Sequence, residues 1–378
     1  MTWLPPAIYI DNQTDLEHYI QFWKQEPLLA VDTESNNIYV YQEQVCLIQI
    51  STHEQDFIID PLQIDDLSAL NEIFAAPHIQ KVFHAAEYDL MALKRDFGFT
   101  FCNIFDTLIA ARICGFSQVG LSHLLWNYAG IYHDKSHQLD NWGLRPLSKE
   151  SLIYAQMDTH YLPLLRDEFE KLLRHKNCWS EAQEAFEEVC HTPPAKKRTF
   201  DPDEFWHLGL PNHLTHTQLK VLRELCILRD HLAVKRNLPP NDVLSNKALV
   251  QIARRAPSTV KKLRRLRYLS SKQARRDGTK IIKAVKTGLQ AKHLPEPPRF
   301  NPPDPTIVDR YTALINWRKE RALARGVESD VIISKQTLWA LAHEAPTQID
   351  DLQGIQGLGP WRLDTYGQEI LQILQEYS

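Results

Sequence analysis

The chain has 378 residues, 43% of them hydrophobic and 24% charged, which is typical of a soluble globular protein with two or three domains. Its formal net charge is −4, no run of about 20 apolar residues predicts a transmembrane helix, and the first residues lack the features of a signal peptide. The six cysteines are scattered without a Cys-x-x-Cys pair, which argues against a zinc site and predicts reduced thiols in the cytoplasm.

An apolar run at residues 28–31 predicts a buried strand that ends in two acids, Asp32 and Glu34. Because these acids are two residues apart on a strand, their side chains should lie on the same face of the sheet. Residues 45–51 and 57–60 have the composition of two further strands, and the turn pair Asp60-Pro61 ends the second of them.

Alternating strands and helices follow. Residues 81–84 predict a fourth strand, and the helix expected from residue 88 to residue 97 carries Asp89 in its first turn. Residues 103–106 predict a fifth short strand, and Asp106 is expected to cap the helix that follows it. This order predicts an α/β domain over residues 1–190, with helices on both faces of the sheet.

A third acidic block lies in a segment with helical spacing. Tyr154 and Asp158 are four residues apart and therefore share one face of that helix. Acidic groups gathered at one spot repel one another unless cations lie between them, and Mg²⁺ or Mn²⁺ prefers oxygen ligands. Two such ions about 3.5–4 Å apart can bind the attacking and leaving oxygens of a phosphoryl transfer.

The second half of the chain is predicted to be helical and repetitive. An exposed linker is expected at residues 191–210, and six prolines mark a second linker at 294–305. The helical patterns of residues 211–293 and 306–378 resemble each other, since each contains an Ala-Pro break, at Ala256 and at Ala345. The glycines at 354, 357 and 359 indicate a turn between helices, because no strand precedes them as a phosphate-binding loop requires.

The charge of the chain is divided unequally. Residues 1–190 carry 12 basic and 28 acidic residues, whereas residues 191–378 carry 31 and 19, and the segment 247–292 has 15 basic residues against one acid. This excess predicts binding to a polyanion through phosphates, with a solvated helix face as the alternative. The candidate nucleic-acid-binding residues are Lys261, Lys262, Arg264, Arg265, Arg267, Arg275 and Arg276.

The acidic blocks, in this order and with the tyrosine four residues before the last aspartate, resemble the DEDDy branch of the DEDD 3′→5′ exonucleases. Together with the repeated tail, the whole chain resembles the ribonuclease D family, in which two HRDC domains follow the catalytic domain. The resemblance implies a ribonuclease H-like fold and a site at which Asp32, Glu34, Asp89 and Asp158 hold two Mg²⁺ or Mn²⁺ ions. In that site Asp32 bridges both ions, while Tyr154, whose pKa of about 10 makes it a poor base, orients the attacking water.

The resemblance further implies trimming of structured RNA, such as a tRNA precursor, to 5′-mononucleotides. It places Lys135 and Trp142 on the substrate side, whereas His160 is expected to be structural. A DNA exonuclease and a non-catalytic RNA-binding scaffold remain alternatives, since DEDD sites act on both polymers. No membrane association is expected, and the sequence names no protein partner.

Overall fold

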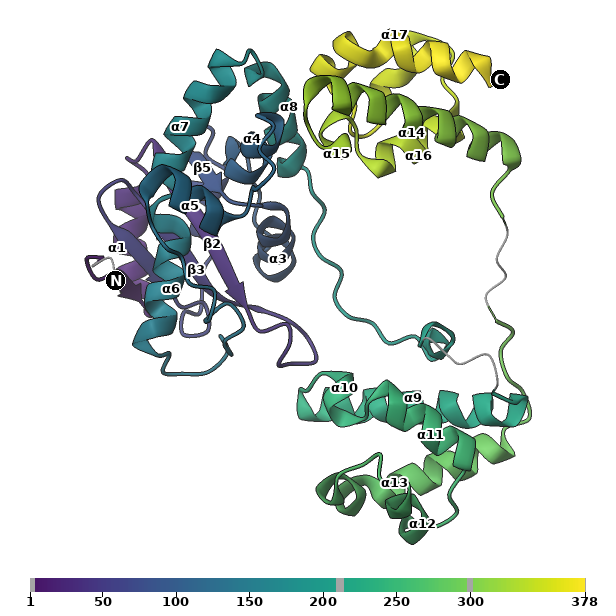
Figure 1. Cartoon of the computed structure of the whole chain (residues 1–378). Helices are drawn as coiled ribbons and strands as arrows, with labels where there is room; N and C mark the ends of the chain where they lie inside the picture. Colours follow the sequence, from purple (N-terminus) through teal and green to yellow (C-terminus); the bar gives the residue numbers. More distant parts are fainter. Residues whose placement is uncertain (1–3, 209–213, 298–301, 378) are drawn as a thin grey trace. The chain divides into compact units, whose positions relative to one another are not determined.

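The computed structural model describes residues 4–208, 214–297 and 302–377 (Figure 1). It consists of two compact units: residues 1–35, 44–195 and 302–378 form the first, and residues 36–43 and 196–301 form the second. No helix of the described residues is long and apolar enough to cross a membrane. The predicted boundary at residue 210 and the centre of the predicted linker at 294–305 lie outside the described residues, so these limits stay predictions.

A mixed six-stranded sheet forms the centre of the first unit, with the strand order β1-β4-β3-β2-β5-β6. Strand β3 is antiparallel to β2 and β4, and the other neighbouring strands pair in parallel. The strands are β1 (Ile8–Ile10), β2 (Leu28–Ser35), β3 (Val45–Ser51), β4 (Asp56–Ile59), β5 (Gln80–Phe83) and β6 (Ile104–Asp106). The predicted α/β fold is confirmed; β1, too short for a periodic pattern, is an additional strand.

Helices cover both faces of this sheet (Figure 1). They are α1 (Gln13–Trp23), α2 (Leu70–Phe74) and α3 (Glu87–Phe97) on one face, and α4 (Thr107–Ile113), α5 (Leu121–Ala129), α6 (Lys149–His160), α7 (Leu162–His175) and α8 (Trp179–Cys190) mainly on the other. Along β2, Leu29 and Val31 belong to the first core and Ala30 to the second. Because side chains alternate along a strand, Asp32 and Glu34 continue the series that faces the second group of helices.

Two helical domains follow. The first helical domain, in the second unit, contains η1 (Glu204–His207), α9 (His216–Arg236), α10 (Pro240–Val243), α11 (Asn246–Arg255), α12 (Val260–Arg265) and α13 (Ser271–Gln290). The second helical domain, in the first unit, contains α14 (Pro305–Arg325), α15 (Ser329–Ile332), α16 (Lys335–Glu344), η2 (Ile349–Gly354) and α17 (Pro360–Glu376).

Backbone conformation supports the predicted repeat. The first long helix of each domain ends at a left-handed residue, Asn237 or Gly326, and the third ends likewise at Ala256 or Ala345. A left-handed alanine is uncommon, so its presence at matching positions is strong evidence for a shared structure. The two domains differ at the glycines 354, 357 and 359 of the second domain, which have no counterpart in the first. The first domain has the basic helix α12 where the second has the 3₁₀ helix η2.

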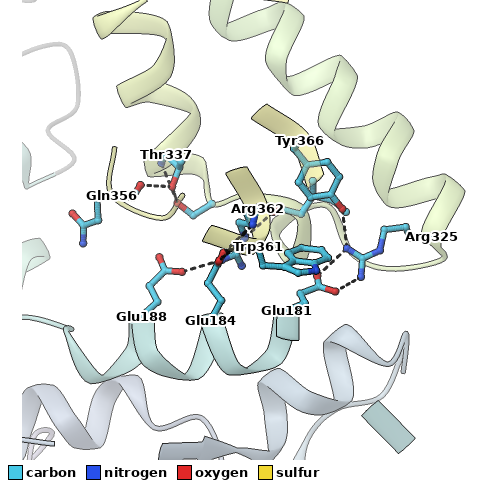
Figure 2. Close-up of polar contacts among 11 residues, drawn as sticks. Glu181, Glu184, Glu188, Arg325, Thr337, Gln356, Trp361, Arg362 and Tyr366 are labelled. Atoms are coloured by element: carbon cyan, nitrogen blue, oxygen red, sulfur yellow. Dashed lines mark hydrogen bonds and ion pairs between the residues drawn. The ribbon is translucent and has the colours of Figure 1, made fainter. Parts of the chain in front are cut away.

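The second helical domain packs against α8 through ion pairs (Figure 2). Both terminal nitrogens of Arg325 donate hydrogen bonds to the carboxylate of Glu181, at 2.8 and 2.6 Å. Glu181 is only 1% exposed. A buried carboxylate needs such a partner, because desolvation of an unpaired charge costs several kcal/mol.

Glu184 of α8 caps the start of α17 (Figure 2). Glycine at the N-cap, Gly359, has no side chain with which to cap the helix, and the Glu184 carboxylate accepts from the backbone N–H of Trp361 at 2.6 Å. The same carboxylate accepts from Arg362 Nη1 at 3.0 Å. A Cβ atom at position 359 would clash with Glu184, so the glycine permits this close approach. The glycine-containing turn therefore brings the start of α17 against a carboxylate of α8, which replaces the missing N-cap side chain.

Replacing Glu184 by alanine should destabilise the first unit by about 1–3 kcal/mol, because it removes the cap of α17 and leaves the buried Arg362 with only its 3.4 Å contact to Glu188. Thermal or denaturant unfolding of the full chain would measure this loss. Glu187→Ala is the matched control, since Glu187 lies on the same helix but is exposed and pairs only with His191 among the contacts described. Equal melting temperatures for the two variants would show that the carboxylate cap contributes little.

Candidate active site

Strand β2 and helix α6 bring together three of the predicted acids. One carboxylate oxygen from each of Asp32, Glu34 and Asp158 lies within 4.8 Å of the others. Asp32 and Glu34 lie opposite Gln49 and Leu47 in the antiparallel pairing of β2 with β3, which fixes the direction of their side chains. Three oxygen donors at this spacing match what a hard divalent cation requires.

Polar contacts to the sheet hold α6, and with it Asp158, in place. Gln156 donates to Asp56 at 2.6 Å, and Thr159 lies 2.7 Å from the hydroxyl oxygen of Ser51. His160 Nδ1 lies 2.8 Å from Asp56, which agrees with the structural role expected of this histidine. Burial acts to raise the pKa of Asp56, but the bonds from His160 and Gln156 keep it below its ordinary value. Asp56 therefore stays ionised as an anchor of α6.

Asp89 reaches the same region from the first turn of α3. It is 7% exposed and accepts a hydrogen bond from the hydroxyl of Thr33, the residue between the two acids of β2. It lies outside the group of three, but its charge, after burial, is the largest contribution that raises the pKa of Asp32. The structure thus brings all four predicted acids into one electrostatic cluster.

Asp106 caps α4, as predicted, by accepting from Leu108 N at 2.8 Å. It also accepts from the backbone N–H of Ala85 and Ala86, at 3.1 and 2.7 Å, and so fixes the turn that precedes α3 and Asp89. His84 lies 2.9 Å from Thr107, and burial lowers its pKa to about 4, so this histidine is neutral.

Burial disfavours ionisation of all four acids, and the charges of neighbouring acids add to this effect at Asp32 and Glu34. Burial, followed by the charges of Asp158 and Asp89, raises the pKa of Glu34 to about 9. Burial raises the pKa of Asp89 to about 7, although the hydrogen bond from Thr33 opposes it. Burial likewise raises the pKa of Asp158, and that of Asp32 well above its ordinary range. Such a cluster binds cations favourably, because a bound cation relieves the repulsion.

Tyr154 lies one helical turn before Asp158 and is 7% exposed. Its ring packs near His133 and Trp142, with centroids 5.2 and 6.2 Å away. Burial and then the charge of Asp158 raise its pKa, so the phenol stays protonated and acts as a hydrogen-bond donor to Asp158. A protonated phenol can orient a water molecule but cannot serve as a base at neutral pH.

His133 is a further residue of the site that no sequence pattern indicates, and its Nε2 lies 3.0 Å from Asp158 Oδ1. It stands in the loop between α5 and α6, where no periodic pattern indicates which side chains turn inward. Trp142, expected on the substrate side, is instead 1% exposed and packs in the core beside Tyr154, whereas Lys135 is exposed and its charge lowers the pKa of Asp158.

The seven predicted nucleic-acid-binding residues lie on α12, on α13 and between them, and all are exposed. Arg276 pairs with Asp277, the single acid of the segment, at 3.1 Å, and Asp277 also binds Arg236. The other six form a surface with little neutralising charge, which is suited to phosphate groups.

Replacing Glu34 by glutamine should stabilise the metal-free protein. The pKa of Glu34 is about 9 when folded and about 4.3 when unfolded, so the folded state binds more protons between these values and its stability falls as pH rises. Glutamine does not titrate, so the gain in melting temperature over wild type, measured in EDTA, should grow from about pH 5 to about pH 9.

Adding Mg²⁺ should then raise the melting temperature of the wild type more than that of Glu34→Gln. Asp65→Asn, which changes an exposed acid of the same domain, is the control. If the gain in melting temperature of Glu34→Gln over wild type in EDTA did not vary with pH, the stabilisation would not have an electrostatic origin.

Comparisons with known proteins identify the domains of the chain. A family model described as 3′-5′ exonuclease matches residues 7–174, and the HRDC domain model matches residues 218–285 and 308–374. The crystal structure of the catalytic core of RRP6 from Trypanosoma brucei is 29% identical, with a TM-score of 0.69 over 76% of this chain and 81% of that one. Escherichia coli RNase D, 24% identical, has the same fold, with a TM-score of 0.68 over 99% of this chain and 100% of its own.

The curated ribonuclease D of Gluconacetobacter diazotrophicus is 30% identical over 98% of this chain and 93% of its own length. The similarity therefore extends over the catalytic domain and both helical domains, and with the acidic cluster it identifies the family. The chain belongs to the ribonuclease D family of 3′→5′ exoribonucleases.

Proposed function

We propose that the chain shortens structured RNA from its 3′ end, one nucleotide at a time, with two Mg²⁺ or Mn²⁺ ions held by Asp32, Glu34, Asp89 and Asp158. The observation that carries the proposal is the group of Asp32, Glu34 and Asp158, whose ligand oxygens lie within 4.8 Å of one another. Four acids with raised pKa values are unfavourable without cations, and their oxygens fit hard divalent ions.

The metal ions would supply an acidified water and neutralise the charge that develops on the phosphate. The side chains have separate tasks: the charges of the other three acids all act on Asp32, which suits it to bind both ions, and Tyr154 donates a hydrogen bond in the direction of Asp158. The phenol, being protonated, positions the water. Attack by the water oxygen forms a new bond to phosphorus and breaks the bond to the 3′-oxygen, which releases a 5′-mononucleotide and leaves a shortened strand with a 3′-hydroxyl.

Substrate holding is assigned to the basic surface of the first helical domain. Its exposed lysines and arginines on α12 and α13 suit the phosphates of a folded RNA such as a tRNA precursor. Tyr268 is the one aromatic residue in segment 247–292, so binding through base stacking is a minor contribution there. The competing functions are cleavage of DNA from its 3′ end and RNA binding without catalysis.

Full-length protein with Mg²⁺ or Mn²⁺ should shorten a 5′-labelled RNA into a ladder of products, and EDTA should abolish the ladder. Asp32→Asn should lower the rate by about 10³-fold or more, since metal-ion catalysis is worth several kcal/mol. Asp65→Asn should cleave normally. Faster cleavage of a matched DNA strand would favour the DNA exonuclease, and undiminished cleavage by Asp32→Asn would reject the proposed site.

Neutralising Lys261, Lys262, Arg264, Arg265 and Arg267 together to glutamine should weaken binding to tRNA-like RNA and flatten its salt dependence. The slope of log K against log salt should lose roughly 0.7–0.9 for each phosphate contact removed. Lys319→Gln with Lys335→Gln, two exposed changes in the second helical domain, is the control. The slope is measured by titration of RNA at several salt concentrations. If it does not change, this surface does not bind RNA.

A further inference from the structure

His133 occupies a place in the site that neither the acidic blocks nor the proposed metal ligands account for. It is 5% exposed, and its Nε2 lies 3.0 Å from Asp158 Oδ1. A buried imidazole against a buried carboxylate is costly unless the two groups interact, because each loses its contact with water.

The other side of the ring is also held. His133 Nδ1 lies 3.2 Å from the hydroxyl oxygen of Ser122 on α5. Helix α5 is anchored by Leu124 and Leu125, both fully buried in the second core of the sheet. If Ser122 donates its hydroxyl proton to Nδ1, the proton of the neutral imidazole is on Nε2. The buried Nε2 atom makes no well-aligned hydrogen bond among the described residues, so its 3.0 Å approach to Asp158 Oδ1 is a close polar contact.

This contact acts on a side chain that the rest of the site needs in one orientation. Asp158 belongs to the group of three acids, and α6 fixes its backbone through Gln156 and Thr159. The orientation of its carboxylate depends on side-chain contacts, one with Tyr154 on its own helix and one with His133. Holding Oδ1 fixes the plane of the carboxylate and so the direction of its second oxygen. Burial raises the pKa of Asp158, and the contact with His133 is the largest influence that lowers it again.

We propose that His133 is a positioning residue: through Nε2 it fixes the Asp158 carboxylate for divalent-metal binding, and Ser122 fixes the ring of His133. The inference rests on the proposed metal site. It predicts a role in metal affinity that is separate from RNA binding, since His133 is buried and reaches the site through Asp158 alone among the four acids. Groups beyond the direct ligands that orient them typically contribute about 10–100-fold to metal affinity.

The test is Mn²⁺ binding to the full chain without RNA, measured by calorimetry and by the Mn²⁺-induced rise in melting temperature. His133→Leu keeps an apolar side chain in the space and removes the donor, so Mn²⁺ affinity should fall by about 10–100-fold. His133→Gln retains an N–H donor and should restore part of the loss, and Ser122→Ala should lose less. His123→Leu, an exposed histidine on the same helix as Ser122, should bind Mn²⁺ as the wild type does.

Activity supplies the second measurement. For His133→Leu the Mn²⁺ concentration at half-maximal rate should rise, the rate at saturating Mn²⁺ should recover most of its wild-type value, and the KM for RNA should stay constant. Unchanged Mn²⁺ affinity in His133→Leu would overturn the proposal. Normal affinity with a lower kcat and an altered pH profile would also overturn it, because His133 would then transfer a proton.

Asp32→Asn, measured alongside, separates this inference from the proposed function. If Asp32→Asn loses Mn²⁺ binding and His133→Leu keeps it, the metal site stands and the positioning role is rejected. If Asp32→Asn also binds normally, the metal site itself is wrong. If His133→Leu fails to fold, the Mn²⁺ affinities of His133→Gln and Ser122→Ala are compared with that of wild type. Wild-type affinity in both variants would reject the positioning role of His133.

Discussion

Repulsion between carboxylates is the constraint on which this structure depends. Four acids face one region: burial raises the pKa of each, and the charges of the neighbouring acids raise the pKa values of Asp32 and Glu34 further. The protein holds them there by anchoring every element that carries one. Strand β2 is central in the sheet, α6 is bound to β3 and β4 by polar side chains, and Asp106 fixes the turn before α3. The stability lost at the site is supplied by these surroundings, as is usual for functional sites.

The same repulsion applies to the substrate. An RNA strand carries one negative charge per nucleotide, so an acidic catalytic domain without metal should repel the polymer it cleaves. In the proposed function, the basic residues of the first helical domain would attract RNA without metal, and metal ions at the acids would neutralise charge at the reaction centre. The two sets of charges would then serve binding and chemistry separately.

The sequence predicted the parts of the site that follow local rules. Asp32 and Glu34 share a strand face, and Tyr154 and Asp158 share a helix face, so period alone placed each pair. The meeting of the two pairs in space could be predicted only from the resemblance to a family, because residues more than 100 positions apart leave no periodic signal in the sequence. His133 was missed because it lies in a loop, where side-chain direction depends on tertiary packing. The position of the second helical domain was missed for a related reason: Glu181 and Glu184 look like ordinary surface acids of an amphipathic helix until the partner arginines are in place.

The capping of α17 by Glu184 has a consequence for dissecting the protein. A shortened chain that ends before residue 302 would place Glu181, Glu184 and Glu188 in water on one face of α8, three like charges at helical spacing with no cationic partners from the second helical domain. Helix α8 contacts β6 and α4, so its loosening would reach the catalytic sheet. Such a fragment keeps the basic surface of α12 and α13, so lost processing would reflect a weakened enzyme core and would not show that the second helical domain binds RNA. The acids of α8 and the residues Arg325, Arg362 and Gly359 form one interface, so a charge removed on either side leaves a partner unpaired on the other.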